Sequence, residues 1–225
     1  MLETLFIKNF TENGELYLES LAATLQMVII SLLIAAILGF FIGVLLVITR
    51  AGHLAENEKV FQFLNVIVNA LRSMPFIILM VAIMPLTKIL SGTTIGVRGA
   101  IVPLVVFSAP FIARLTESAL LEVDPGVIEA FKAMGASRRQ IIISVMLKEA
   151  LPGLILALTV ATIGLVGATA MAGVVGAGGL GDLALRYGYQ RWNPEVMFGC
   201  VFIIWGMVQG IQSMGNYFSK SLRRK

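Results

Sequence analysis

The stretch from Asp124 to Ser137 reads DPGVIEAFKAMGAS and contains the start and stop signals of one short helix. Asp124 can cap the helix N-terminus, and Pro125 suits the first helical position, where no backbone N–H is needed. Gly135 suits the turn just past the last helical residue, because glycine adopts the left-handed conformation at little steric cost. The stretch therefore predicts a short helix with defined ends, set between longer hydrophobic blocks.

This predicted helix is amphipathic. At 100° per residue, Val127, Phe131 and Met134 share one face, whereas Glu129 and Lys132 lie on the other. An apolar face outside a hydrophobic block needs a cover, and we expect a soluble partner protein to provide it. A helix that lies on the lipid surface would also have such a face, but its polar face would usually carry more charge.

The composition is that of a membrane protein. The chain is 58% hydrophobic and 13% charged, with a mean hydropathy of +0.91, which excludes a soluble globular enzyme. Three uncharged stretches each exceed the roughly 20 residues needed to cross a bilayer, namely Ser20–Thr49, Ala150–Gly181 and Val196–Ser219. Two further hydrophobic blocks contain Arg72 and Arg114.

These blocks predict an all-α polytopic membrane protein with five transmembrane helices in a single transmembrane domain, residues 1–225. The expected spans are residues 20–49, 60–87, 98–121, 150–175 and 195–219, and residues 122–149 form the loop that holds the short helix. Pro75 predicts a kink in the second span, and Pro103 and Pro110 predict a bent or broken third span.

The lysines and arginines are segregated between loops, which orients the chain. If the helices alternate, ten fall on one side: Arg50, Lys59, Lys132, Arg138, Arg139, Lys148, Lys220, Arg223, Arg224 and Lys225. Five fall on the other: Lys8, Lys88, Arg98, Arg186 and Arg191. The positive-inside rule then predicts an external N-terminus, a cytoplasmic C-terminus and a cytoplasmic short helix. Because the charges follow the loops, they do not indicate nucleic-acid binding.

Residues that carry catalytic or metal chemistry are scarce. His53 is the only histidine and Cys200 the only cysteine, so we expect no metal site. Gly176–Gly181 has GxGxxG spacing, but it follows a hydrophobic block and not the strand of a βαβ unit, so a dinucleotide site is not expected. The sequence has no Walker-type phosphate loop. We expect a chain that holds no cofactor and does not hydrolyse ATP itself.

A polar stripe runs along the second block. Gln62, Asn65, Asn69 and Arg72 recur at i, i+3, i+7 and i+10 on an otherwise apolar helix. Since hydrocarbon offers these side chains no partner, they face the aqueous interface, a neighbouring helix or a water-filled path. Under the third alternative, Asn69 and Arg72 are candidates for a translocation path. We expect no pair of opposite charges deep in any span, and hence no visible substrate site.

Small residues mark two of the blocks. Met171 is the one long side chain in the run Gly167–Gly173, where a flexible thioether can close a narrow passage. Met171 is therefore a candidate gate, although filling a packing gap is the common role of methionine. The following Gly176–Gly181 is not expected to be helical. In the first block, Gly39 and Gly43 form a small-residue face that suits close helix packing.

The loop residues also resemble a known family. Glu129-Ala130, then Gly135, then Leu151-Pro152 is similar to the EAA loop of binding-protein-dependent ABC importer permeases. Two positions depart from the family pattern, since Phe131 stands where a second alanine is usual and Lys148 where a proline is expected. Neither departure affects the short helix itself.

Four stretches resemble, in order, the methionine-import permease subfamily, MetI: residues 68–79, 110–114, 130–136 and 176–181. The resemblance implies a type I ABC importer permease fold in the bacterial cytoplasmic (inner) membrane. It implies that two copies of the chain form the path for substrate and that two cytoplasmic ABC ATPase subunits, which use ATP and Mg²⁺, bind below. An extracytoplasmic methionine-binding lipoprotein would deliver D- or L-methionine, which moves by alternating access.

Two alternatives stay open. A permease for another small polar substrate would share the same EAA loop. A channel or carrier that works without ATP belongs to a different class, and such carriers usually show inverted repeats and ionisable residues at the membrane midplane. We see neither feature in the sequence.

The resemblance gives the loop a mechanical role. Ser137 and Gln140 can form a capping box that opens a second helix, Ser137–Leu147, so that two short helices meet at the Gly135 turn as a lever. The side chains expected to enter a groove on the ATPase are Val127, Ile128, Ala130, Phe131 and Met134. Glu129 is expected to bond the lever's own backbone or a neighbouring basic group.

Overall fold

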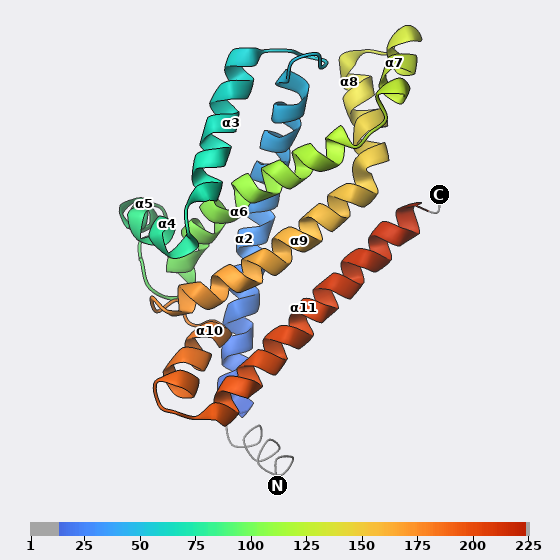
Figure 1. Ribbon diagram of the computed structural model, residues 1–225. Helices are drawn as coiled ribbons and strands as arrows, with labels where there is room; N and C mark the ends of the chain where they lie inside the picture. Colours follow the sequence, from blue (N-terminus) through green and yellow to red (C-terminus); the bar gives the residue numbers. More distant parts are fainter. Residues whose placement is uncertain (1–13, 224–225) are drawn as a thin grey trace. The chain divides into compact units, whose positions relative to one another are not determined.

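The computed structural model describes residues 14–223, and the regular elements in this range are all helices (Figure 1). In chain order they are α2 Gly14–Thr49, α3 Glu58–Ser73, α4 Phe76–Ala82, α5 Met84–Ser91, α6 Gly96–Leu121, α7 Pro125–Ala133, α8 Arg138–Gln140, the π-helix η1 Ile141–Met146, α9 Leu147–Gly173, α10 Gly179–Leu183, the π-helix η2 Ala184–Tyr189 and α11 Pro194–Arg223. The predicted all-α fold is confirmed. Lys8, Arg224 and Lys225, which entered the charge comparison, lie outside the described residues.

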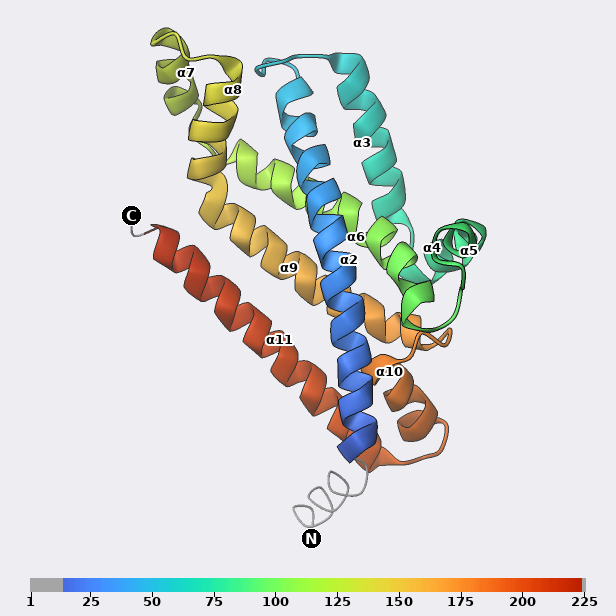
Figure 2. The ribbon, with the colours of Figure 1, turned by 180° about the vertical axis from the view of Figure 1, so that it is seen from behind.

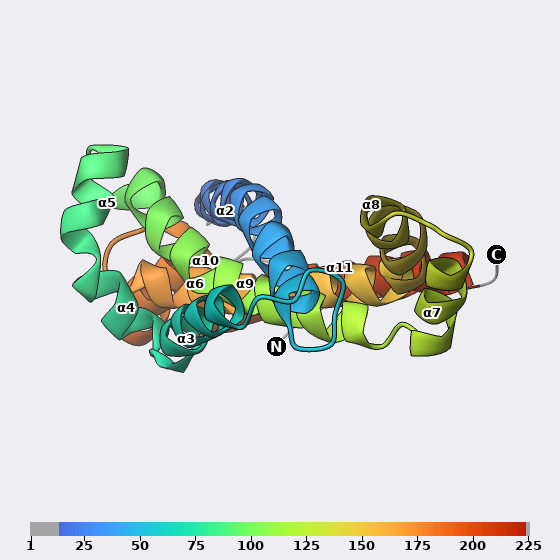
Figure 3. The same cartoon turned by 90° about the horizontal axis from the view of Figure 1, so that it is seen from above.

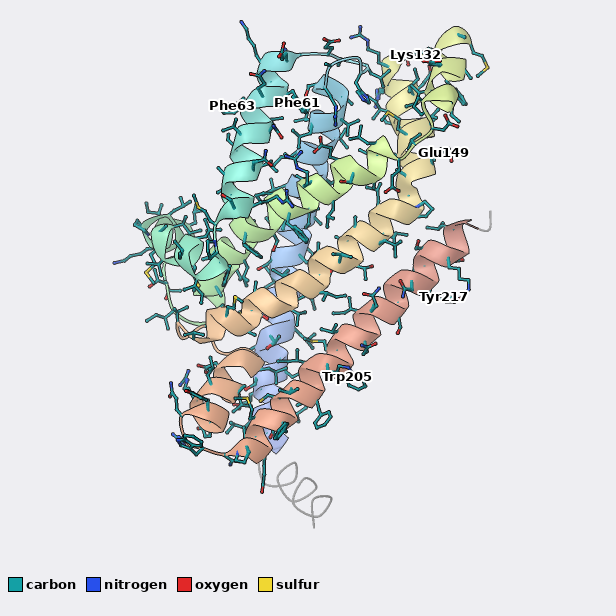
Figure 4. All side chains as sticks on the ribbon, in the orientation of Figure 1. Phe61, Phe63, Lys132, Glu149, Trp205 and Tyr217 are labelled. Atoms are coloured by element: carbon teal, nitrogen blue, oxygen red, sulfur yellow. The ribbon has the colours of Figure 1, made fainter. Side chains whose placement is uncertain are left out.

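Within the described residues, four helices are long and apolar enough to cross a membrane: Gly14–Thr49, Gly96–Leu121, Arg138–Gly173 and Pro194–Leu222. A fifth span results if α3 and α4 are counted together, although the chain bends by 109° between them. The side chains of Trp205 and Tyr217 project from α11 and are largely exposed, as expected for residues that face lipid (Figure 4).

The bend between α3 and α4 corrects the expectation of one kinked helix over residues 60–87. Pro75 adopts an extended conformation, with φ −59° and ψ 136°, and α3 ends two residues before it. Proline has no N–H to donate and disfavours the helical conformation of the preceding residue, here Met74. A second break at Ile83 separates α4 from α5. Neither Pro103 nor Pro110 breaks α6, contrary to expectation.

The described chain packs as two compact units. The first draws on the segments up to Ile34, Met74–Phe107 and Thr162–Ile211, and the second on Ala35–Ser73, Ser108–Ala161 and the segment from Gln212 on. The long helices α2, α6, α9 and α11 contribute residues to both units.

In the first unit, α10 lies beside the N-terminal half of α2 (Figure 2). The backbone N–H of Leu180 donates a hydrogen bond to the Thr24 Oγ1 at 2.9 Å. Gly179 has φ +85°, and a Cβ at this position would lie 2.7 Å from the same hydroxyl. Only glycine therefore fits both the conformation and the close approach here.

In the second unit, α2 and α6 pack at close range through glycine. A Cβ added to Gly39 would lie 2.6 Å from the Ala109 carbonyl oxygen, and one added to Gly43 would lie 2.6 Å from the Ala113 carbonyl oxygen. The predicted small-residue face is confirmed, and it meets another helix of the same chain. Helix α3 lies beside the C-terminal half of α2 and completes this part of the unit (Figure 1).

We expect Gly43→Ala to destabilise the chain, although alanine is normally the better helix former. The added methyl overlaps α6, and overpacking of this kind costs about 1–3 kcal/mol. Thermal unfolding of the detergent-purified chain measures the effect. Gly206→Ala is the matched control, because a Cβ there meets no atom of the described chain within 4 Å. Equal melting temperatures for the two variants would contradict the close α2–α6 contact.

Candidate functional site

Helix α7 begins and ends as its sequence predicts. The Asp124 Oδ1 accepts a hydrogen bond from the backbone N–H of Gly126 at 2.8 Å, and Pro125 is the first helical residue. At the other end, Gly135 has φ +79° and its backbone N–H donates to the Lys132 carbonyl at 3.0 Å. The cap and the glycine stop are both confirmed, and they fix the length of the helix.

The chain then turns back, so that α7 and α8 form a hairpin (Figure 3). The predicted capping box is present: the Ser137 N–H donates to the Gln140 Oε1 at 2.8 Å, and the Gln140 N–H donates to the Ser137 Oγ at 3.3 Å. The expected end of this helix at Leu147 is wrong. The segment runs through η1 into α9 as one helix, Arg138–Gly173, because neither glycine nor proline occurs before Pro152.

The underside of α7 packs on the second unit's own core. The buried members of this cluster are Val47, Leu54, Leu120, Val123, Ile141, Met146 and Ala150. Ile128 and Ala136 pack against them from the hairpin. Ile128 was expected among the residues that enter a partner's groove. It serves instead to anchor α7 on the ends of α6 and α9.

The face of α7 that carries Phe131 and Met134 is only partly covered by the described chain. Phe131 and Met134 are 37% and 70% exposed, and both border a hollow that Gly135, Gln140 and Ser144 also line. Isolated exposed apolar residues are ordinary, but two large ones beside a hollow on a capped helix form a surface that a partner can fill.

The remaining expected contact residues differ in exposure. Ala130 and Glu129 are exposed, whereas Val127 is half-buried. Within residues 14–223, Glu129 makes no hydrogen bond or ion pair, so the expected bond to the lever's backbone is not formed. Its carboxylate is available to a basic group of another protein. Lys132 also lies on α7, and Glu149 lies near the start of α9 (Figure 4).

A second hollow separates α7 from the loop after α2. His53 and Leu54 line it from the loop, and Glu129 and Lys132 line it from α7. The pKa of His53 is lowered from its ordinary value, first by burial and then by the positive charges of Arg50 and Lys132. The imidazole, which lies between the loop and α7, is therefore uncharged near neutral pH.

The polar stripe of α3 binds a neighbouring helix. The Arg114 Nη2 of α6 donates to the Oδ1 atoms of Asn65 and Asn69, both at 2.7 Å. Gln62 bonds Glu58 of its own helix. Of the three alternatives for the stripe, contact with a neighbouring helix therefore holds for its two asparagines.

Arg114 also forms an ion pair within α6, in the last third of a candidate span, whereas no pair of opposite charges was expected deep in any span. Its Nη1 lies 2.6 Å from the Oε2 of Glu117, whose side chain is 4% exposed. Glu117 was not among the predicted site residues, although Arg114 and Glu117 have the i, i+3 spacing of an ion pair within one helix. Arg72, the last residue of the stripe, has its guanidinium carbon 5.9 Å from the centre of the Phe111 ring.

Met171 lies near the end of α9 and is 49% exposed. It belongs to the first unit, whereas Asn69 and Arg72 belong to the second. Helix α9 ends at Gly173, and the following turn is not helical, as expected, but α10 begins already at Gly179. The expectation that Gly176–Gly181 lacks helix is thus wrong for its last three residues.

Residues 39–224 match the family described as "Binding-protein-dependent transport system inner membrane component". A protein from Vibrio cholerae, named "Probable D-methionine transport system permease protein MetI", is 46% identical to this chain. The match covers 92% of this chain and 92% of the relative. This chain is 45% identical, over 80% of its length and 82% of the relative's, to the "Methionine import system permease protein MetP" of Bacillus subtilis.

Solved structures agree with this match. The structure titled "Inward facing conformations of the MetNI methionine ABC transporter: CY5 SeMet soak crystal form" contains a chain that is 44% identical. The structural match covers 94% of this chain and 98% of the solved chain, with a TM-score of 0.91. An amino acid ABC transporter solved with histidines is 17% identical, with a TM-score of 0.79, and shares the fold. The resemblance found in the sequence and the expected importer permease fold are confirmed.

The lowered pKa of His53 predicts a pH dependence. As the pH falls below the ordinary histidine pKa, the unfolded chain binds a proton that the folded chain does not, so stability is lost until the pH reaches the folded pKa. We expect the melting temperature to fall more between about pH 7.5 and about pH 5.5 in the wild type than in His53→Gln. Equal losses in the two proteins would show that His53 is not held neutral.

Proposed function

This chain belongs to the family of binding-protein-dependent transport system inner membrane components, and we propose that it is the permease subunit of an ATP-driven methionine importer. The observation that carries the proposal is the capped helix α7, anchored by Ile128 below and exposing Phe131 and Met134 above. The substrate follows from the relatives, which are named as permeases for methionine or D-methionine. We propose that both enantiomers are carried.

Helix α7 is the coupling element. Its exposed face docks into a groove on a cytoplasmic ABC ATPase, with Phe131 and Met134 as anchors, Val127, Ala130 and Gly135 as close contacts, and Glu129 facing a basic group of the ATPase. Because Ile128 packs on the core that α6 and α9 share, a displacement of α7 moves both helices. ATP-driven closure of the ATPase thereby shifts the permease between inward-open and outward-open states.

The chemical work is done elsewhere. Two ATPase subunits bind ATP and Mg²⁺, while this chain holds no cofactor and catalyses no reaction. The role of this chain is to convert the movement of α7 into a change in the side of the membrane to which the substrate path opens. Support comes from the solved relative, which is a chain of a methionine ABC transporter.

The assembly we propose is a homodimer in the bacterial cytoplasmic membrane. Two copies enclose the path, because one set of four or five spans is small for a conduit of its own. The loop charges place the N-terminus outside and α7 and the C-terminus in the cytoplasm. An extracytoplasmic methionine-binding lipoprotein delivers substrate to the outer face, and selectivity resides largely in that protein.

Met171, Asn69 and Arg72 are the residues we propose for the path. Met171 is half exposed near the end of α9 and can close a passage lined by small residues. Asn69 and Arg72 are exposed on α3, where they can contact water in the cytoplasmic half of the path.

We expect Phe131→Asp to abolish co-purification of the ATPase, because a buried carboxylate without a partner opposes docking. Phe131→Leu, which keeps an apolar side chain at the same position, is the matched control. ATPase recovered with the tagged permease from membranes is the measurement. Equal recovery with both variants would refute docking through α7.

Met171→Ala is expected to raise methionine leak through the reconstituted complex in the absence of ATP, since alanine cannot fill the passage. Val174→Ala, at another exposed residue just beyond α9, is the control. Radiolabelled methionine efflux from proteoliposomes measures the leak. Identical efflux from the wild type and the Met171 variant would leave Met171 a packing residue.

Uptake tests the function as a whole. Proteoliposomes that contain the permease and the ATPase, supplied with the binding protein, should accumulate D- and L-methionine only with ATP. Accumulation without the ATPase would instead identify a carrier that works alone, and preference for another amino acid would reassign the substrate.

A further inference from the structure

A polar network in the second unit joins α3, α6 and the first residue after α2. Arg114 of α6 is its hub: one guanidinium nitrogen bonds Glu117 at 2.6 Å, and the other bonds Asn65 and Asn69 of α3 at 2.7 Å each. The Asn69 Nδ2 also donates to the Asn65 Oδ1 at 3.3 Å. Arg50, just past α2, approaches the second oxygen of Glu117 at 3.8 Å. Charges inside a candidate span are costly, so this arrangement calls for a function.

The two ends of the network differ in burial. The Glu117 side chain is 4% exposed and that of Arg114 is 23% exposed, whereas Arg50 is 46% exposed. An interior carboxylate strengthens its bond to a nearby guanidinium, because little water screens the pair. Glu117 thus fixes the Arg114 side chain, and Arg114 in turn presents its second nitrogen to α3.

The network lies directly behind the anchor of α7. Glu117 is one turn from Leu120, which is buried in the cluster that Ile128 packs against. Helix α6 therefore carries both features: Leu120 lies in the cluster under α7, and one turn before it Glu117 pairs with Arg114, which bonds the two asparagines of α3. Other described links of α3 to these helices are the apolar contact of Val68 with Leu46 and Ala113 and the approach of Arg72 to the Phe111 ring of α6. Apolar surfaces slide more readily than directed, charged hydrogen bonds.

We infer that Glu117 and Arg114 are positioning residues of the transport cycle, which lock α3 to α6 so that both follow α7 as one body. The inference rests on the proposed function. The same pair of charges suits a zwitterionic amino acid, but both terminal guanidinium nitrogens of Arg114 already have partners in the chain and the Glu117 side chain is closed to solvent. The network therefore transmits movement and does not bind substrate.

The test compares Glu117→Gln and the double variant Asn65→Ser/Asn69→Ser with the wild type, each reconstituted with the ATPase and the binding protein. Gln62→Ala is the control, because Gln62 lies on the same helix but bonds only Glu58 of α3. The readouts are methionine transported per ATP hydrolysed and the KM for transport.

We expect both network variants to assemble with the ATPase and to hydrolyse ATP. The amount of methionine transported per ATP should fall about tenfold, which is within the range typical of coupling between sites. The KM for transport should stay unchanged. The double variant keeps the test valid if Glu117→Gln does not assemble, since the two asparagines are not buried. An unchanged ratio in the variants that assemble would overturn the inference. A raised KM with an unchanged ratio would also overturn it and make the pair a substrate contact. A wild-type complex that does not transport methionine with ATP would refute the proposed function instead.

Discussion

The apolar contact between α7 and the ends of α6 and α9 is the interaction on which the rest of the structure depends. Ile128 packs against the cluster that contains Leu120, Val123, Ile141 and Met146, while Phe131 and Met134 stay exposed. The helix is too short to be stable alone, so its caps and this contact decide its position. Ile128 packs on the core of the same chain, whereas Phe131 and Met134 are exposed to a partner. A force that a partner applies to α7 is therefore passed directly to the membrane-spanning helices.

Behind this contact, the second unit uses two different means to hold its helices together. Glycines 39 and 43 let α2 approach the α6 backbone, which gives dispersion contacts without a hydrophobic driving force, as is usual in a bilayer. Arg114 and Glu117 add directed bonds from α6 to α3. The first kind of contact permits close packing and the second fixes register, and together they suit a unit that moves without deforming.

How far the sequence predicted these features depended on the range of the interactions. The α7 caps, the Gly135 stop and the Ser137–Gln140 box involve residues within a few positions, and all were predicted correctly. The 109° bend at Pro75 was not, because proline permits a break whose angle is set by distant packing. The inward role of Ile128 depends on which side of α7 meets the core, which the helical period alone does not determine. The burial of Glu117 was not predicted, because it depends on how other segments pack around α6, which the sequence of α6 alone does not determine.

The central claim is that the open side of α7 meets a cytoplasmic ATPase. The most direct measurement places a photoreactive amino acid at Met134 in the full chain, illuminates intact membranes and identifies the cross-linked species by mass spectrometry. The account predicts a cross-link to an ABC ATPase subunit, lost when the ATPase is absent. A cross-link to lipid alone, or to a protein on the external side of the membrane, would contradict it.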